Sequence, residues 1–252
     1  MNVLERALVE KAGREHGWEN VLESVGPRVV LASARHRGRA TVTAAADGEG
    51  WQVTFPEARL VRELGRTLPE LASGGGAFRA PHFDALAALL RRAAELSLAL
   101  PDQAAHTFRE RTAKALAGIA DKGTEVERLV RQRVGQDVFR EALLDYWEGA
   151  CAVTGLVLPE VLRASHAKPW TKCDSDEERL DVFNGFILVA HLDALFDRGL
   201  IGFDDAGAML IAARVATEHR SALHLDERLR LRWIAPEHQR FLQWHREHVL
   251  QA

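Results

Sequence analysis

The hydrophobic pattern of the chain changes twice along its length, and these changes limit the folds that it can adopt. Residues 28–55 hold three short β-branched runs, RVVLASA, ATVTAAA and WQVTF, which predict a three-stranded meander. Apolar residues at helical spacing then predict three helices: 82–99, 104–121 and Thr124 to about Trp147. After Gly149 the pattern becomes one of short apolar segments set among proline and glycine. The sequence therefore predicts an α+β protein with two domains and a helical connector.

The boundaries are expected where the pattern changes, with a first domain over 1–100, a connector over 101–147 and a second domain over 148–252. Further helices are predicted over 2–15 and 57–66, and the SGGG stretch at 73–76 reads as a loop. Thr124 and Glu127 have the spacing of a capping box at the start of the second connector helix, which begins at Thr124. The first domain is thus a mixed α/β-meander domain, and we assign it a DNA-recognition or sensor role.

Charge and cysteine content narrow the functional classes only slightly. The formal net charge is −3, so a polyanion would have to be met by a local basic patch rather than by a bulk cationic field. The start, MNVLERALVEKA, carries charges where a secretory signal needs an apolar stretch, and no membrane-spanning run is present. Two cysteines are too few for a disulfide scaffold. We expect a cytoplasmic protein.

Three groups of polar residues follow one another in the second domain. Ser165 and His166 lie on a predicted strand, Asn184 opens a second strand, and His191 and Asp193 enter a short helix. Phosphodiester hydrolysis needs a deprotonated water and a cation that neutralises charge on the phosphate oxygens. A neutral imidazole accepts the proton of that water, and a carboxylate holds Mg²⁺ or Mn²⁺. We expect the side chains of residues 166 and 193 to converge on one cation and one water.

The surrounding sequence resembles the HNH endonucleases, particularly their restriction-type branch. The resemblance covers about residues 124–215 and rests on two runs, GQDVFREALLDYWEGACAVTGLVLPEVLRASHAKPW and ERLDVFNGFILVAHLDALFDRGLIGFDD. It implies a C-terminal ββα-metal nuclease domain that uses a divalent metal. It also implies that His166 is the general base and that Asn184 steadies the loop between the strands and, with it, the base.

The third position of the family pattern falls on a residue of a different type. The family places a His or Asn that binds metal about nine residues after the central Asn, which here is Asp193. His191 is two residues short and remains the alternative metal ligand, since the two positions lie about 200° apart on a helix. Many family members also have Asp or His before the base, where this chain has Ser165. The second metal ligand is therefore left open.

The remaining candidates are cysteines and basic residues. Cys151 and Cys173 lack the close pairing of a zinc site, so two buried thiols and no structural zinc are expected. The basic run RHRGR at 35–39 lies at a predicted β-turn, where an ordinary polar hairpin and a DNA-probing tip both fit. Phosphate contacts and solvated helix faces both fit the cations of the second domain. The predicted DNA-binding residues are Arg133, Arg140, Lys168 and Arg179.

These features favour a DNA endonuclease whose first domain selects double-stranded DNA by sequence or base modification. The resemblance implies a role in restriction of foreign DNA. One HNH site cuts one strand, so a double-strand break predicts a homodimer. Two other functions fit the same residues: a catalytically weak or inactive HNH-fold DNA-binding module, and a toxin or effector nuclease that acts on RNA or on any DNA.

Overall fold

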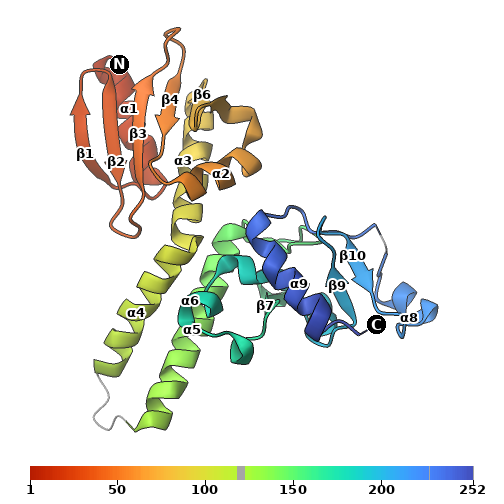
Figure 1. Ribbon diagram of the computed structural model, residues 1–252. Helices are drawn as coiled ribbons and strands as arrows, with labels where there is room; N and C mark the ends of the chain where they lie inside the picture. Colours follow the sequence, from red (N-terminus) through yellow and green to blue (C-terminus); the bar gives the residue numbers. More distant parts are fainter. Residues whose placement is uncertain (118–122, 227, 252) are drawn as a thin grey trace. The chain divides into compact units, whose positions relative to one another are not determined.

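The computed structural model contains both helices and strands and divides into two compact units, Met1–Gln103 and Ala104–Ala252 (Figure 1). The residues described are 1–117, 123–226 and 228–251. The protein is thus of the mixed α+β class. The expected connector, residues 101–147, lies almost wholly within the second unit.

The first unit is built on a six-stranded antiparallel sheet with the strand order β1-β2-β3-β4-β6-β5. The meander predicted over 28–55 is confirmed as β2, β3 and β4. The edge strand β1 has no counterpart in the prediction, because most of its side chains are exposed and its apolar residues follow no regular alternation. The strands are β1 (Asn20–Val25), β2 (Arg28–Ala32), β3 (Arg39–Ala44), β4 (Trp51–Thr54), β5 (Ala72–Gly74) and β6 (Ala77–Ala80).

One face of this sheet is buried and the other carries polar groups. The register aligns Val29, Val42, Val53 and Phe78 across four strands, and all four are buried. The neighbouring row, on the opposite face because side chains alternate along a strand, consists of Arg28, Thr43, Gln52 and Arg79. Three helices of this unit are α1 (Val3–Glu15), α2 (Ala58–Thr67) and α3 (Phe83–Ala99). α3 contacts both other helices, and α1 and α3 contact the strands.

The helices predicted for the first unit are confirmed. The Asn2 side chain accepts from the backbone of Glu5 and so begins α1, and His82 caps α3 in the same way through the backbone of Ala85. The glycines of 73–76, expected as a loop, form the turn between β5 and β6, where Gly74, Gly75 and Gly76 all have positive φ. A short 3-10 helix, Pro69–Leu71, leads into this hairpin.

The basic run at 35–39 connects β2 to β3 and is packed against the rest of its unit. His36 is only 5% exposed, and its ring meets Trp18 edge-on at 4.6 Å between centroids. A Cβ atom on Gly38 would lie 2.8 Å from Oγ of Ser97, and Gln103 donates to the carbonyl of Arg35. Close packing therefore fixes His36 and Gly38, while Arg35, Arg37 and Arg39 are exposed, so the polar hairpin and the DNA-probing tip both fit the structure.

The buried His36 predicts a loss of stability in mild acid. Burial lowers the pKa of His36 from 6.5 to about 4. Between these values the unfolded chain binds the proton and the folded chain does not, so stability is present above pH 6.5 and falls as the pH drops toward 4. We expect a loss on the order of 2 kcal/mol for this residue between pH 7.5 and 5. Denaturant titrations of the full chain at both pH values measure it, and His36→Phe should remove that share of the difference. An equal pH dependence in the variant would contradict the assignment.

The second unit begins with a helical pair, α4 (Pro101–Ala117) and α5 (Thr124–Tyr146). Both predicted helices are confirmed, although the last residues expected for the first, 118–121, lie outside the described part of the chain. The predicted capping box at Thr124 is wrong. Gly123 occupies the N-cap, which has no side-chain hydrogen bond, and Thr124 is already helical.

The rest of the second unit places two hairpins and several short helices around an aromatic core. The rings of Phe186, Phe196 and Phe203 lie within 6 Å of one another, and Tyr146 and Trp147 are fully buried. The described part of the chain has no helix with both the length and the apolar character needed to cross a membrane. The elements are β7 (Leu162–His166), α6 (Asp176–Arg179), β8 (Gly185–Val189), α7 (Ala190–Asp197), β9 (Ile201–Phe203), β10 (Met209–Ile211), α8 (Thr217–Ala222) and α9 (Gln239–His248), with 3-10 helices at Pro159–Val161, Trp170–Lys172, Val182–Asn184 and Pro236–His238.

Gly199 ends α7 as its sequence position predicts. Its φ is +64°, its N–H bonds to the carbonyl of Phe196, and the N–H of Leu200 bonds to that of Leu195, which is a Schellman motif. A Cβ atom here would lie 1.9 Å from the carbonyl oxygen of Val249, so close backbone packing also requires glycine. The hairpin and the terminal helix predicted after it are confirmed as β9–β10 and α9.

Candidate active site

The candidate site is built on an antiparallel hairpin followed directly by a helix. β7 pairs with β8 in the register Ser165 to Phe186 and His166 to Gly185, and α7 starts at the residue after β8. This is the ββα arrangement that the resemblance implied. Because side chains alternate along a strand, Ser165 and His166 point to opposite faces of the hairpin.

His166 ends β7 and is held on three sides. Its ring stacks on Phe139 of α5 with 3.7 Å between centroids, and Trp170 meets it edge-on at 5.9 Å. Nε2 lies 2.9 Å from the carbonyl oxygen of Arg179. A carbonyl oxygen only accepts, so Nε2 carries the proton and Nδ1 carries a lone pair. Burial lowers the pKa of His166 to about 4, and the ring is therefore neutral at pH 7.

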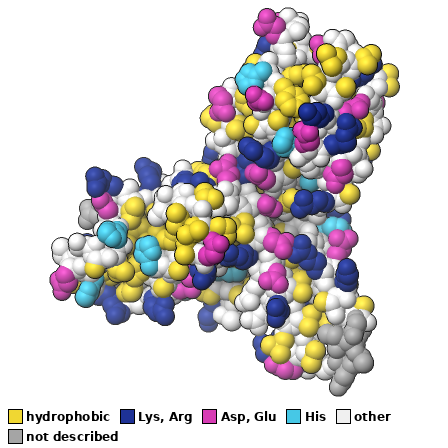
Figure 2. All heavy atoms as spheres, turned by 180° about the vertical axis from the view of Figure 1, so that it is seen from behind, with side chains coloured by type: hydrophobic (Ala, Val, Ile, Leu, Met, Phe, Trp, Pro, Cys, Tyr) yellow, Lys and Arg dark blue, Asp and Glu magenta, His cyan; other side chains and the backbone are white. Residues whose placement is uncertain are grey.

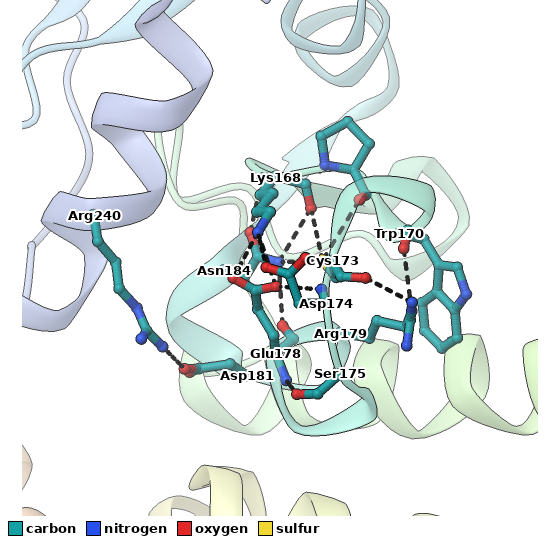
Figure 3. A network of polar contacts seen from close by, with 11 residues as sticks. Lys168, Trp170, Cys173, Asp174, Ser175, Glu178, Arg179, Asp181, Asn184 and Arg240 are labelled. Carbon is teal, nitrogen blue, oxygen red and sulfur yellow. Dashed lines mark hydrogen bonds and ion pairs between the residues drawn. The ribbon is translucent and has the colours of Figure 1, made fainter. Parts of the chain in front are cut away.

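The side chain of Asn184 stabilises the connection between β7 and β8, residues 167–184, through hydrogen bonds (Figure 3). It is completely buried, and its Oδ1 accepts from the backbone N–H of Lys168 at 2.8 Å. Its Nδ2 donates to the carbonyls of Lys168 and Glu178 at 3.1 and 3.2 Å and contacts Sγ of Cys173 at 3.4 Å. This connection includes Arg179, whose carbonyl holds His166. The network of Asn184 thus fixes the segment that orients the imidazole.

The two cysteines are free and buried in this unit. Cys173 lies within the Asn184 network, where burial raises the pKa of its thiol to about 11. Cys151 accepts a hydrogen bond from the backbone of Thr154 at the start of the domain.

Asp193 lies on α7 against the back of β7. The hydroxyl of Ser165 donates to its Oδ1, which accounts for a serine beside the base. His191 lies on the same helix and is exposed to solvent. Partial desolvation of its ring, and to a smaller extent the charge of the nearby His224, lowers its pKa. Of the two alternatives, Asp193 is the one that bonds to the strand carrying His166.

A pocket of about 320 Å³ lies beside His166 and brings in residues from distant parts of the unit. Asp197 is exposed at its rim. The surrounding protein still displaces part of the water around this carboxyl, and this desolvation together with the charge of Asp193 raises the pKa of Asp197 to about 6. The pocket thus brings His166 together with Asp197, and not with Asp193, the residue expected to converge with it. Asp193 lies one turn before Asp197 and bonds to Ser165, whose side chain points to the other face of the hairpin. The lining also includes Ala164, Trp170, His245 and Val249.

Three of the four cations predicted to contact DNA have partners within the unit. Lys168 pairs with Asp174 and Glu178, and Arg140 donates to the carbonyls of Leu162 and Pro159. Arg179 donates to the carbonyls of Trp170 and Cys173 (Figure 3). It also pairs with Asp176. Arg133 is exposed on α5. A phosphate contact by Lys168 requires its ion pairs to open.

The charges on the drawn face of Figure 2 are mixed, with Lys and Arg set among Asp and Glu. This agrees with the net charge of −3 and with the absence of a bulk cationic field expected from the sequence. A group of three or more His, Cys, Asp and Glu side chains arranged around one metal position does not occur among residues 1–117, 123–226 and 228–251.

The hairpin and the helix, with an imidazole at the end of the first strand, form a ββα unit. Comparison with known families agrees, since residues 151–204 match the family model of the HNH endonucleases. This segment is therefore similar to an HNH endonuclease domain. The match leaves the whole first unit and the C-terminal helix α9 outside. No curated protein matches the chain.

Proposed function

We propose that the protein is a metal-dependent endonuclease that hydrolyses phosphodiester bonds of double-stranded DNA, with His166 as general base. The observation that carries the proposal is the 2.9 Å contact between Nε2 of His166 and the carbonyl of Arg179. It leaves the Nδ1 lone pair of a neutral ring to take a proton. As a water oxygen bonds to phosphorus, its proton passes to Nδ1, and the bond to the leaving oxygen breaks.

The donor atoms beside the pocket fit a divalent metal of the Mg²⁺ or Mn²⁺ type. Asp193 and Asp197 are the residues that would hold it, with the hydroxyl of Ser165 next to them. Mg²⁺ is usually bound by one or two carboxylates, with water completing its shell. Desolvation, and after it the charge of Asp193 one turn away, raises the pKa of Asp197. When bound, such an ion neutralises the charge that builds on the phosphate oxygens.

In this proposal the first unit selects the DNA and the second cuts it. The polar sheet row of Arg28, Thr43, Gln52 and Arg79 supports a recognition role, because side chains of these types can hydrogen-bond to phosphates and base edges. Arg28 and Arg79 would first have to leave their ion pairs with Glu23 and Asp47. Restriction of foreign DNA in the cytoplasm is the corresponding biological role. A double-strand break needs two such sites, and a homodimer supplies them.

A second candidate function is a DNA-binding module that keeps the HNH fold without cutting. It is favoured by the bond between Ser165 and Asp193, which occupies one carboxylate oxygen, and by the lack of a three-ligand cluster in the described residues.

Incubation of the purified chain with supercoiled plasmid distinguishes the two functions. With Mg²⁺ or Mn²⁺ we expect conversion to open-circular and linear DNA, and with EDTA no conversion. Unmodified plasmid, base-modified plasmid and RNA run in parallel define the substrate. Binding in a gel-shift assay without nicking by either metal would favour the second candidate, and preferential cleavage of RNA would contradict the DNA assignment.

A further inference from the structure

The C-terminal end of α7, which carries Asp197, is covered by the last residues of the chain. The backbone N–H of Gln251 donates to the carbonyl of Gly199 at 2.9 Å, and its side chain donates to that of Arg198 at 2.7 Å. The side chain of His245 on α9 meets a third carbonyl, that of Phe196, with 3.0 Å to Nε2. The carbonyls of residues 196, 198 and 199, at and just beyond the end of α7, are thus bonded from a segment about fifty residues away, and that of Phe196 also accepts from the N–H of Gly199.

His245 is the member of this segment that also lines the pocket. His245 is 1% exposed. Its ring stacks on that of Phe196, with 3.9 Å between the centroids and 2° between the planes. Because a carbonyl only accepts, Nε2 of His245 is the donor. Burial lowers the pKa of His245 to about 4, so the donor is a neutral imidazole.

We infer that His245 is a positioning residue of the active site, which holds the last turn of α7 so that Asp197 lines the pocket of His166. This inference rests on the proposed function in that it takes Asp197 as a metal ligand. It extends the active site to α9, which lies outside residues 151–204.

A space-filling role alone does not account for histidine at this position. Nδ1 of His245 is buried without a hydrogen-bond partner in the described part of the chain. A buried unpaired polar atom is destabilising, and a phenyl ring would keep the stack on Phe196 without that cost. What imidazole supplies and phenyl does not is the N–H that reaches the carbonyl of Phe196. This N–H donates to the carbonyl of Phe196, the residue immediately before Asp197.

The test compares His245→Phe, which keeps the ring and removes the donor, with His245→Gln, which keeps a donor. We expect the phenylalanine variant to melt at or above the wild-type temperature. Its half-saturating Mn²⁺ concentration should rise by about 10- to 100-fold, the usual effect of removing a group that orients a metal ligand. Mn²⁺ binding is measured by the electron paramagnetic resonance signal of the free ion, and nicking is measured in parallel. The glutamine variant should recover most of the affinity.

His248→Phe is the matched control, because His248 is an exposed histidine of the same helix and stacks on Trp244. It should bind Mn²⁺ as the wild type does. If His245→Phe does not fold, His245→Asn replaces it, since its amide is too short to reach the carbonyl of Phe196. Wild-type Mn²⁺ affinity in a folded variant without the donor overturns the inference.

Hydrogen exchange separates this inference from the proposed function. If the wild type neither binds Mn²⁺ nor nicks DNA, the proposed function fails, and the backbone amides of residues 197–199 then decide the role of His245. Faster exchange at these amides in His245→Phe than in the wild type supports the positioning role. Unchanged exchange overturns it.

Discussion

Replacing His166 with alanine is expected to lower the rate of metal-dependent plasmid nicking by about 10²- to 10⁴-fold, the usual contribution of a general base. The variant loses the Nδ1 lone pair that takes the proton of the attacking water. It also leaves a gap against the ring of Phe139, on which the imidazole stacks. Single-turnover nicking at saturating Mn²⁺ measures the loss, and a gel shift should show that DNA binding is kept.

Two further measurements define the cause of the loss in His166→Ala. Free imidazole should restore part of the activity, since it enters the gap and supplies the missing base. The matched control is His191→Ala, which removes an exposed histidine from α7 and should change the nicking rate by less than about twofold, as for surface substitutions in general. Nicking by His166→Ala at the wild-type rate would remove the assignment of the base.

Local sequence patterns predicted most of the helices and strands. The longer helices were predictable because their apolar residues recur at helical spacing over many residues, and Gly199 because it follows the last periodic residue of α7. The short helices α6 and α8 were not predicted. β1 was missed because an exposed edge strand buries little and so has no regular apolar pattern. The capping box at Thr124 failed because the helix begins one residue earlier than the motif requires.

The sequence predicted the positions of site residues only where the local geometry of one hairpin brings them together. His166 and Asn184 stand at the ends of adjacent strands, so their proximity follows from the hairpin. The choice between Asp193 and His191 depends on which face of α7 meets β7, and this is set by packing rather than by spacing. Asp197 follows Asp193 by one turn and was predictable as its neighbour, but not as a residue of the pocket.

Long-range partners carry no signal in a single sequence. His245 lies 49 residues beyond Phe196, and the contact between them exists only once α9 has packed on α7. The same limit applies to the predicted DNA contacts. The sequence shows that Lys168 and Arg140 are cations, but not that Lys168 pairs with Glu178 or that Arg140 donates to the carbonyl of Leu162. A basic residue in a nuclease domain is therefore weak evidence for a phosphate contact.

Asn184→Ala is expected to destabilise the second unit by about 3 to 5 kcal/mol, since two or more buried backbone groups lose their partners at about 1–3 kcal/mol each. The N–H of Lys168 and the carbonyls of Lys168 and Glu178 all bond to this side chain. Nicking should also fall in the fraction that remains folded, because the carbonyl of Arg179 that orients His166 lies in the loosened segment. Urea titrations of the full chain followed by tryptophan fluorescence measure the first effect.

The control for Asn184→Ala is Asn20→Ala, which removes an exposed asparagine at the start of β1 and should change stability by no more than about 0.5 kcal/mol. The loss of stability in the Asn184 variant tests whether its hydrogen bonds stabilise the fold, and the loss of nicking tests whether they orient His166. If stability falls while the nicking rate per folded molecule stays at the wild-type value, the network supports the fold but does not orient the base. If the unfolding midpoint is unchanged, these hydrogen bonds do not hold the connection between β7 and β8. The geometry of His166 would then depend on its stacking with Phe139 instead of on the carbonyl of Arg179.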